Sequence, residues 1–173
     1  PPEIEDRQFP GHWEGDLIKG EGNASAVGTL VERTSRLVML VKLPEFKPAS
    51  ATNVLQAFTD KLLGIAQPMR LSMTYDQGRE MSMHKKLSEQ TGIAVYFCDP
   101  HSPWQRGSNE NMNGLVRQYL PKGTDLSIYS QEQLDAIADE INNRPRKGLG
   151  VRSPLAVYRE LLVNSPQHST LIH

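Results

Sequence analysis

The sequence predicts an α/β protein built on a five-stranded mixed β-sheet, three antiparallel strands and then parallel strands, flanked by helices. Two patterns lead to this prediction. The N-terminal part contains three short β-rich runs in succession, and the part that follows alternates helix-like with strand-like segments. With 173 residues, of which 38% are hydrophobic and 23% charged, the chain has the length and composition of one globular domain with its own core.

Three β-rich runs come first, at residues 13–18, 26–32 and 37–43. Gly and Asn residues after the first run favour a turn, and the polar residues between the second and third have the length of a hairpin connection. The simplest arrangement is three antiparallel strands in succession, with Asp16 on or beside the first.

The next segments predict a strand–helix–strand unit preceded by a helix. Before Gly64, which provides a C-terminal stop, apolar residues recur at the three- and four-residue steps of an amphipathic helix. The compact run at residues 70–75 predicts a buried strand that ends at Asp76, just before a Gln-Gly turn. A helix over residues 79–90 and a strand over residues 93–98 follow, which implies a parallel crossover.

The segment around Glu110 predicts a two-sided helix. At about 100° per residue, four apolar side chains lie on the side away from Glu110. These residues are Met112, Leu115, Val116 and Tyr119. Asn113 and Arg117 fall on the side of Glu110, and Gly114 lies there too, where a missing side chain lets a ligand backbone approach. The exposed face therefore suits a groove for a sugar-phosphate chain.

Two further helices have clear start signals. Ser130 and Gln133 fit a capping box at the start of a helix over residues 130–142, and Ser153-Pro154 begins a shorter one. The turn between them, residues 142–148, is basic. It is either a solvated turn or a contact for phosphate, which carries affinity without sequence choice.

Several classes of protein are disfavoured by composition. The longest apolar run, about six residues at 93–98, is far below the roughly 20 needed to cross a bilayer. The N-terminus has no initiator Met and no secretory signal, and it looks like a cut made inside a longer protein. We expect a linker remnant at 1–10, a core domain at 11–162 and a tail at 163–173. The single Cys98 excludes an internal disulfide and a multi-thiolate zinc site, and suits a reducing compartment such as the bacterial cytoplasm.

The charge balance counts against strong autonomous DNA binding. Nineteen basic and twenty acidic residues give a net charge of −1, whereas a self-sufficient DNA-binding domain is usually clearly basic. Local basic surfaces remain possible, because the basic residues cluster in two groups. One group is Arg144, Arg146, Lys147 and Arg152, and the other is Arg106, Arg117 and Lys122.

Three carboxylates stand at the edges of predicted elements: Asp16, Asp76 and Glu110. Most acidic residues are solvated surface groups, and this is the alternative for any one of them. Carboxylates that converge at such edges coordinate hard cations such as Mg²⁺ or Mn²⁺. Two such ions, about 3.5–4 Å apart, drive in-line displacement at phosphorus. The pattern predicts an enzyme that cuts and joins phosphodiesters.

Four sequence strings resemble the catalytic core of bacterial insertion-sequence transposases. They are GHWEGDLI at 11–18, YDQG at 75–78, PWQRGSNENMNG at 103–114 and RQYLPKG at 117–123. The chain is similar to the insertion sequence thirty family, within the wider superfamily of DDE transposases and retroviral integrases. This resemblance extends from about residue 11 to about residue 158.

The resemblance implies a ribonuclease H-like fold in which Asp16, Asp76 and Glu110 are the catalytic, metal-binding triad. It implies Mg²⁺ or Mn²⁺ as cofactor, two ions per active site when DNA is bound. Arg117, seven positions after the glutamate, would contact phosphate near the scissile bond. The other DNA-contact residues we expect are Asn113, Arg106, Lys122, Arg144, Arg146 and Lys147.

Family members also carry an N-terminal helix-turn-helix region, which nothing in this sequence matches, and they generally act as multimers. The expected partners are therefore transposon-end DNA, target DNA and further copies of the protein. Two alternatives stay open. One is a non-catalytic DNA-binding or multimerisation module with this fold, and the other is a nuclease limited to hydrolysis.

The remaining aromatic and histidine residues are weaker candidates. No two of His12, His84 and His101 have the spacing of a metal site, and a transition-metal site is disfavoured. His12 and His101 could line the rim of the active site, but surface positions are the better expectation. Trp104 could stack on a DNA base, although anchoring the start of a helix is favoured.

Overall fold

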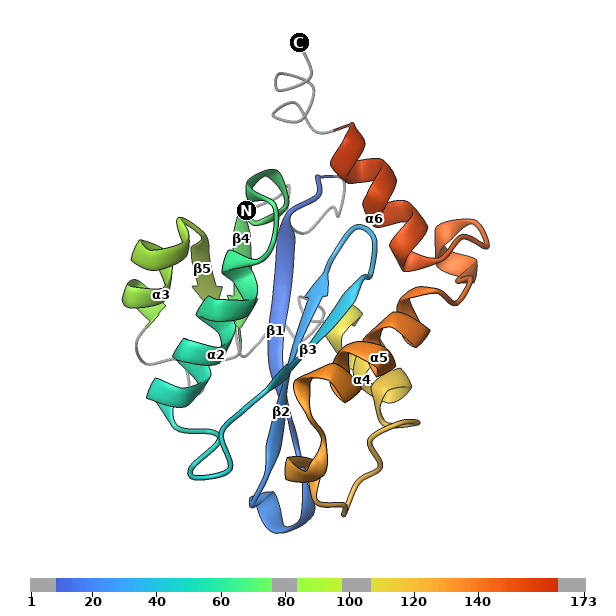
Figure 1. Ribbon diagram of the computed structural model, residues 1–173. Coiled ribbons are helices and arrows are strands. Elements are labelled where there is room, and N and C mark those ends of the chain that lie inside the picture. Colours follow the sequence, from blue (N-terminus) through green and yellow to red (C-terminus); the bar gives the residue numbers. More distant parts are fainter. Residues whose placement is uncertain (1–8, 76–83, 98–106, 165–173) are drawn as a thin grey trace.

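The computed structural model describes residues 9–75, 84–97 and 107–164 and shows a five-stranded mixed sheet between two layers of helices (Figure 1). The strands run in the order β3-β2-β1-β4-β5. Their bounds are β1 His12–Lys19, β2 Ala26–Glu32, β3 Val38–Lys42, β4 Ser72–Tyr75 and β5 Ala94–Phe97. The first three strands pair antiparallel, and β4 and β5 join them in parallel, which confirms the predicted sheet.

Helices account for most of the remaining described residues. The α-helices are α2 Ala51–Leu63, α3 His84–Thr91, α4 Gly107–Val116, α5 Gln131–Asn142 and α6 Pro154–Val163. Short 3-10 turns are η1 Glu21–Asn23, η2 Gln67–Met69, η5 Leu126–Ile128 and η6 Lys147–Leu149. None of the helices within these ranges has the length and apolar character needed to cross a membrane.

The predicted helix starts and stops are confirmed where the structure describes them. The Ser130 hydroxyl accepts a hydrogen bond from the backbone N–H of Gln133, and the side chain of Gln133 accepts one from the backbone N–H of Ser130. These two bonds complete the capping box of α5. Ser153 caps α6 through the backbone N–H of Ala156. Gly64 is the C-cap of α2.

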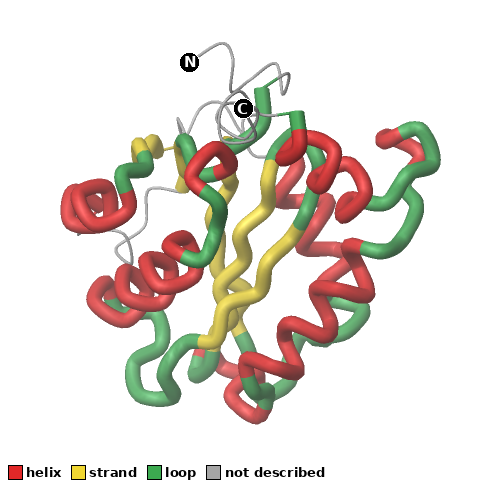
Figure 2. Tube along the Cα trace, turned by 45° about the horizontal axis from the view of Figure 1, so that its top comes forward, coloured by secondary structure: helices red, strands yellow, loops and turns green. Residues whose placement is uncertain are grey.

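Helices cover both faces of the sheet (Figure 2), and each face carries its own hydrophobic core. Side chains of α2, α3 and α6 pack on one face, and those of α4 and α5 on the other. Successive residues of a strand point to opposite faces. Trp13 and Leu17 of β1 therefore enter the first core, whereas Ile18 enters the second. By the same alternation, Asp16 faces the layer of α4 and α5.

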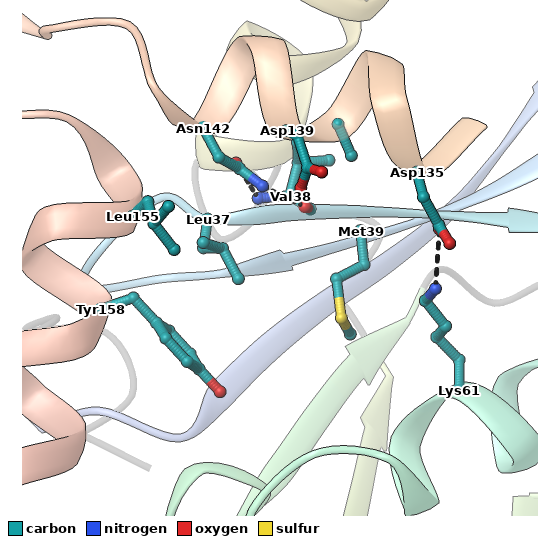
Figure 3. A pocket seen from close by; sticks show the side chains of 10 residues that line it. Leu37, Val38, Met39, Lys61, Asp135, Asp139, Asn142, Leu155 and Tyr158 are labelled. Atoms are coloured by element: carbon teal, nitrogen blue, oxygen red, sulfur yellow. Dashed lines mark hydrogen bonds and ion pairs between the residues drawn. The ribbon is translucent and has the colours of Figure 1, made fainter. Parts of the chain in front are cut away.

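The outer edge of the sheet, strand β3, is covered by side chains of α5 rather than by another strand. The Asn142 amide accepts from the Val38 N–H at 2.9 Å and donates to the Val38 carbonyl at 2.8 Å (Figure 3). Gln131 does the same further along, accepting from Lys42 N–H and donating to the Leu40 carbonyl. Uncovered strand edges pair with other chains, so these two amides close a surface prone to aggregation.

Below Asn142, the α5 layer and α2 meet across a hollow of about 350 Å³ that lies against β3 (Figure 3). Lys61 of α2 bridges it by an ion pair with Asp135 of α5, 3.1 Å between Nζ and Oδ1. Both side chains are partly exposed, and such pairs contribute little stability. Burial of α5 side chains in the second core and the two amide clamps, rather than this ion pair, hold α5 against the sheet.

A buried carboxylate closes the turn between β2 and β3. Glu32 is fully buried and accepts hydrogen bonds from the backbone N–H groups of Gly11, Thr34 and Ser35 and from the Ser35 hydroxyl. Burial raises the pKa of Glu32, and the hydrogen bonds offset only part of that rise. The charge of Glu32 adds to the burial that raises the pKa of Tyr158 to about 12.

This raised pKa predicts a pH-dependent stability. The folded protein holds the Glu32 proton more tightly than the unfolded chain, whose glutamate pKa is about 4.3. The contribution of Glu32 to the free energy of unfolding is therefore largest below that pH, and it is lost as pH rises through the folded-state pKa of Glu32. In urea denaturation at a series of pH values, the unfolding free energy of the wild type should fall relative to Glu32→Gln over this range. If the difference in unfolding free energy between the wild type and Glu32→Gln stayed constant with pH, the pKa of Glu32 would not be raised by folding.

Candidate active site

Asp16 lies in the middle strand of the sheet and is half-buried. It pairs with Thr29 of β2, and the Thr29 hydroxyl donates to the Asp16 carbonyl at 3.4 Å. The Asp16 Oδ1 accepts the Leu17 N–H at 2.8 Å. A central strand fixes the backbone on both sides, so the position of this carboxylate is set by the sheet itself.

Helix α4 reaches Asp16 from the second face of the sheet. Asn113 Nδ2 donates to Asp16 Oδ2 at 3.3 Å, a contact between residues 97 positions apart. The predicted burial of the helix is confirmed: Met112 and Val116 are fully buried, and Leu115 and Tyr119 pack against the same core. The polar side of α4 thus faces the carboxylate of β1.

A groove of about 370 Å³ runs beside this contact. It is lined by Leu17, Ile18, Asn113, Gly114, Arg117 and Lys122. A Cβ added at Gly114 would meet nothing within 4 Å, so the expected opening on this side of the helix is confirmed. Three of the polar residues expected to meet DNA, namely Asn113, Arg117 and Lys122, therefore share one groove next to Asp16.

Arg117 also has a structural role that its sequence position does not reveal. Its guanidinium donates to the Lys19 carbonyl at 2.9 Å and to the Leu120 carbonyl at 3.3 Å. Partial burial lowers the pKa of Arg117. These bonds fasten the end of α4 to the end of β1 and fix one wall of the groove.

Other predicted site residues lie partly or wholly outside the described residues. Glu110 lies within α4, one helical turn before Asn113, but its side chain is outside the described part. The residues outside it altogether are Asp76, Arg106, His101 and Trp104. Across residues 9–75, 84–97 and 107–164, no three His, Cys, Asp or Glu side chains come together around a possible metal position.

The basic turn after α5 contributes no residue to the lining of this groove. Arg144 is exposed, stacks over the Tyr119 ring at 5.4 Å and donates to the Gln118 side chain. Arg146 is half-buried, and Lys147 is exposed at the start of η6. Arg144 thus contacts the two residues that follow Arg117 in the chain.

The sequence did not predict that other polar residues on the same face of β1 as Asp16 are buried. Glu14 and Arg33 form an ion pair, 3.2 Å between Oε1 and Nε, with side chains only 1% and 4% exposed. The expected surface position of His12 is wrong: it is buried, and its Nδ1 lies 2.6 Å from the Ser72 hydroxyl. Glu14 and His12 occupy even-numbered positions of β1, as Asp16 does, so the strand alternation places all three on one face. The sequence shows this alternation, but only the sheet order shows that β1 is covered on both sides.

Comparisons with known proteins agree with this architecture. The integrase core domain family matches residues 6–103. The transposase for insertion sequence element IS1086 of Cupriavidus metallidurans is 65% identical over 164 residues, which are 95% of this chain and 48% of that protein. Transposase InsI for element IS30A of Escherichia coli K12 is 49% identical over 151 residues, 87% of this chain and 38% of that protein.

Among solved structures, the catalytic core domain of BIV integrase superposes with a TM-score of 0.61 at 22% identity, covering 87% of this chain and 94% of that one. The expected ribonuclease H-like fold is thereby confirmed. The chain belongs to the integrase core domain family. Within it, the sequence falls with the IS30-type transposases, and it spans about half, or less, of the length of the curated relatives it matches.

Proposed function

We propose that this chain is the catalytic domain of a DDE transposase, which cuts DNA strands and joins the resulting 3′ ends to target DNA. Asp16, Asp76 and Glu110 are its metal ligands and catalytic residues. The observation that carries the proposal is the Asn113–Asp16 hydrogen bond, because it brings the polar side of α4 onto the carboxylate of β1. The two relatives described above are named as transposases, which supports the same function.

Chain connectivity supports convergence of the three carboxylates. Gly15 pairs with Tyr75, the last described residue of β4. In the sequence Asp16 follows Gly15 and Asp76 follows Tyr75, and consecutive Cα atoms are about 3.8 Å apart. Glu110 precedes Asn113 by three residues on α4, and residues at this spacing share one side of a helix. Asp16 and Glu110 thus lie on two elements that line the groove, and Asp76 follows a strand that pairs with β1.

Carboxylate oxygens fit hard divalent cations, and Mg²⁺ or Mn²⁺ is the cofactor we propose, with two ions bound when DNA is present. Asp16 suits this role because its carboxylate is half-exposed and lies next to a groove-lining residue. When bound, the ions would supply an activated water or 3′-hydroxyl and charge stabilisation for the leaving oxygen.

The chain's own residues orient and hold the reactants. Asn113 and the Leu17 amide fix the two oxygens of Asp16, so its carboxylate is held in one orientation. Asn113, Arg117 and Lys122 would receive the DNA backbone in the groove, together with Arg106. The basic turn, Arg144, Arg146 and Lys147, would contact phosphate further away.

We propose that transposon ends and target DNA are the partners, that the protein acts as a homo-oligomer in the bacterial cytoplasm, and that a separate N-terminal region reads the element ends. The segments 1–10 and 163–173 would flank a core at 11–162.

A strand-joining assay tests the function. The protein is given labelled DNA carrying pre-cut ends of its own insertion element, a plasmid target, and Mg²⁺, Mn²⁺ or a chelator. We expect joined products with either ion and none with the chelator. Metal-dependent cutting without joining would instead indicate a hydrolytic nuclease. DNA binding with neither reaction would indicate a non-catalytic module.

A further inference from the structure

Two arginines from distant parts of the chain meet at the flank of the sheet near α6. Arg36 ends the turn between β2 and β3, and Arg146 is the residue before η6. A Cβ added at Gly148 would collide with the Arg36 guanidinium, so that group lies directly on the backbone of η6. The charge of Arg36 also reaches Arg146, where it adds to the burial that lowers the pKa of Arg146.

The backbone holds this pair in place. Arg36 has a φ of 63°, a left-handed conformation that a non-glycine residue seldom adopts, and its N–H donates to the Glu32 carbonyl at 2.8 Å. On the other side, Arg146 and Arg152 form an isolated antiparallel bridge that closes the loop around η6. The two guanidinium groups are therefore presented by closed turns and not by loose loops.

No negative group neutralises the pair within the described ranges. Neither Arg36 nor Arg146 forms an ion pair there, and Nη1 of Arg146 is buried without a hydrogen-bond partner. The nearby carboxylates are already engaged: Glu32 accepts from three backbone amides and a hydroxyl, and Glu160 pairs with Arg152. Two like charges this close repel each other, and an anion bound between them would relieve that repulsion.

We propose that Arg36 and Arg146 together bind a phosphodiester group of the DNA backbone, with exposed Lys147 beside them; this rests on the proposed function only for the identity of the ligand. Planar guanidinium groups match the oxygens of a phosphate by paired hydrogen bonds. The site is outside the reaction centre. Thr29 pairs with Asp16, and Arg36 lies beyond Glu32, which is three residues and about 10 Å further along β2. The pair therefore guides the path of bound DNA and takes no part in the chemistry.

The test measures DNA affinity by fluorescence anisotropy with a labelled duplex at several salt concentrations. The variants are Arg36→Gln, Arg146→Gln and both together. Lys86→Gln, an exposed charge on α3 beside the opposite edge strand β5, is the matched control. We expect the double variant to raise Kd about tenfold and to reduce the slope of log Kd against log salt by about 1, with little change for the control. Equal affinities of the double variant and the control, or no measurable affinity of the wild type for the duplex, would overturn the proposal.

Thermal denaturation separates this from a structural role, because removal of two repelling charges should leave the melting temperature unchanged or raised. If the glutamine variants unfold, the Arg36→Lys and Arg146→Lys double variant decides. It keeps both charges and should keep the salt slope, while Kd still rises through loss of the paired hydrogen bonds. An unchanged Kd for this lysine variant would then overturn the proposal.

Strand joining at saturating DNA distinguishes this site from the proposed function. If the wild type joins DNA and the double variant binds like the control, only the phosphate site fails. If the wild type binds DNA through these arginines but neither cuts nor joins it, only the catalytic assignment fails.

Discussion

Replacement of Asp16 by asparagine is expected to lower DNA strand joining by at least about 10³-fold while the protein stays folded. Asparagine keeps one side-chain oxygen, so a hydrogen bond from Leu17 or Asn113 can persist, but it removes the negative charge that a divalent cation requires. Asp76→Asn and Glu110→Gln should have losses of the same size. Because the three acids act as a unit, a double variant should be scarcely less active than a single one.

The measurement is joining of pre-cut ends in Mg²⁺ and in Mn²⁺, with a far-ultraviolet circular dichroism spectrum and a urea titration for each variant. Stability should be unchanged or slightly higher without metal, because mutually repelling acids destabilise the folded state. Asp139→Asn is the matched control, since Asp139 is an exposed aspartate on α5. Full Mg²⁺-dependent activity in any triad variant would remove that residue from the proposed site.

Replacement of Asn142 by alanine is expected to lower the free energy of unfolding by about 3 kcal/mol, the largest stability effect we expect from a single amide. Asn142 is only 5% exposed, and its side chain satisfies both the N–H and the carbonyl of Val38. Alanine would leave two backbone groups of the edge strand unpaired, each costing roughly 1–3 kcal/mol. The freed edge should also make the protein more prone to aggregation.

Urea denaturation gives the free energies, and light scattering at rising protein concentration reports aggregation. The adjacent Asn143→Ala is the control. Asn143 is exposed and its side chain donates only to the Asp139 carbonyl of its own helix, so its loss should cost less than about 1 kcal/mol. Equal effects of the two substitutions would show that the clamp on β3 does not stabilise the fold.

The local elements of this protein were predictable because their determinants lie within a few residues of one another. The capping box of α5 and the buried face of α4 follow from spacings of three and four residues. The strand alternation that sends Asp16 and Ile18 to one face follows from a spacing of two. The candidate site was predictable to the same extent. The sequence predicted that Asp16 lies on or beside a strand and that Asn113 and Gly114 lie on the polar side of α4.

Contacts between distant segments were not predictable in this way. Nothing near Arg33 in the sequence indicates that it pairs with Glu14 inside the protein, and the turn that contains it was expected to be merely polar. The clamp of Asn142 on Val38 joins residues 104 positions apart, and a similar gap separates Arg36 from Arg146. In each case the role of a side chain depends on a partner from a distant stretch of sequence, which only folding brings close.

The sequence by itself determined which segments of this protein become helices and strands, which face of each is apolar, and that Asp16 lies on the first strand. Only the tertiary structure decided that Asn113 reaches Asp16, that Arg117 fastens α4 to β1, and that Arg36 and Arg146 come together on one surface. The reason is physical: hydrogen-bond periodicity and hydrophobic pattern act over one or two turns of chain, whereas the partner of a side chain is chosen by how whole elements pack.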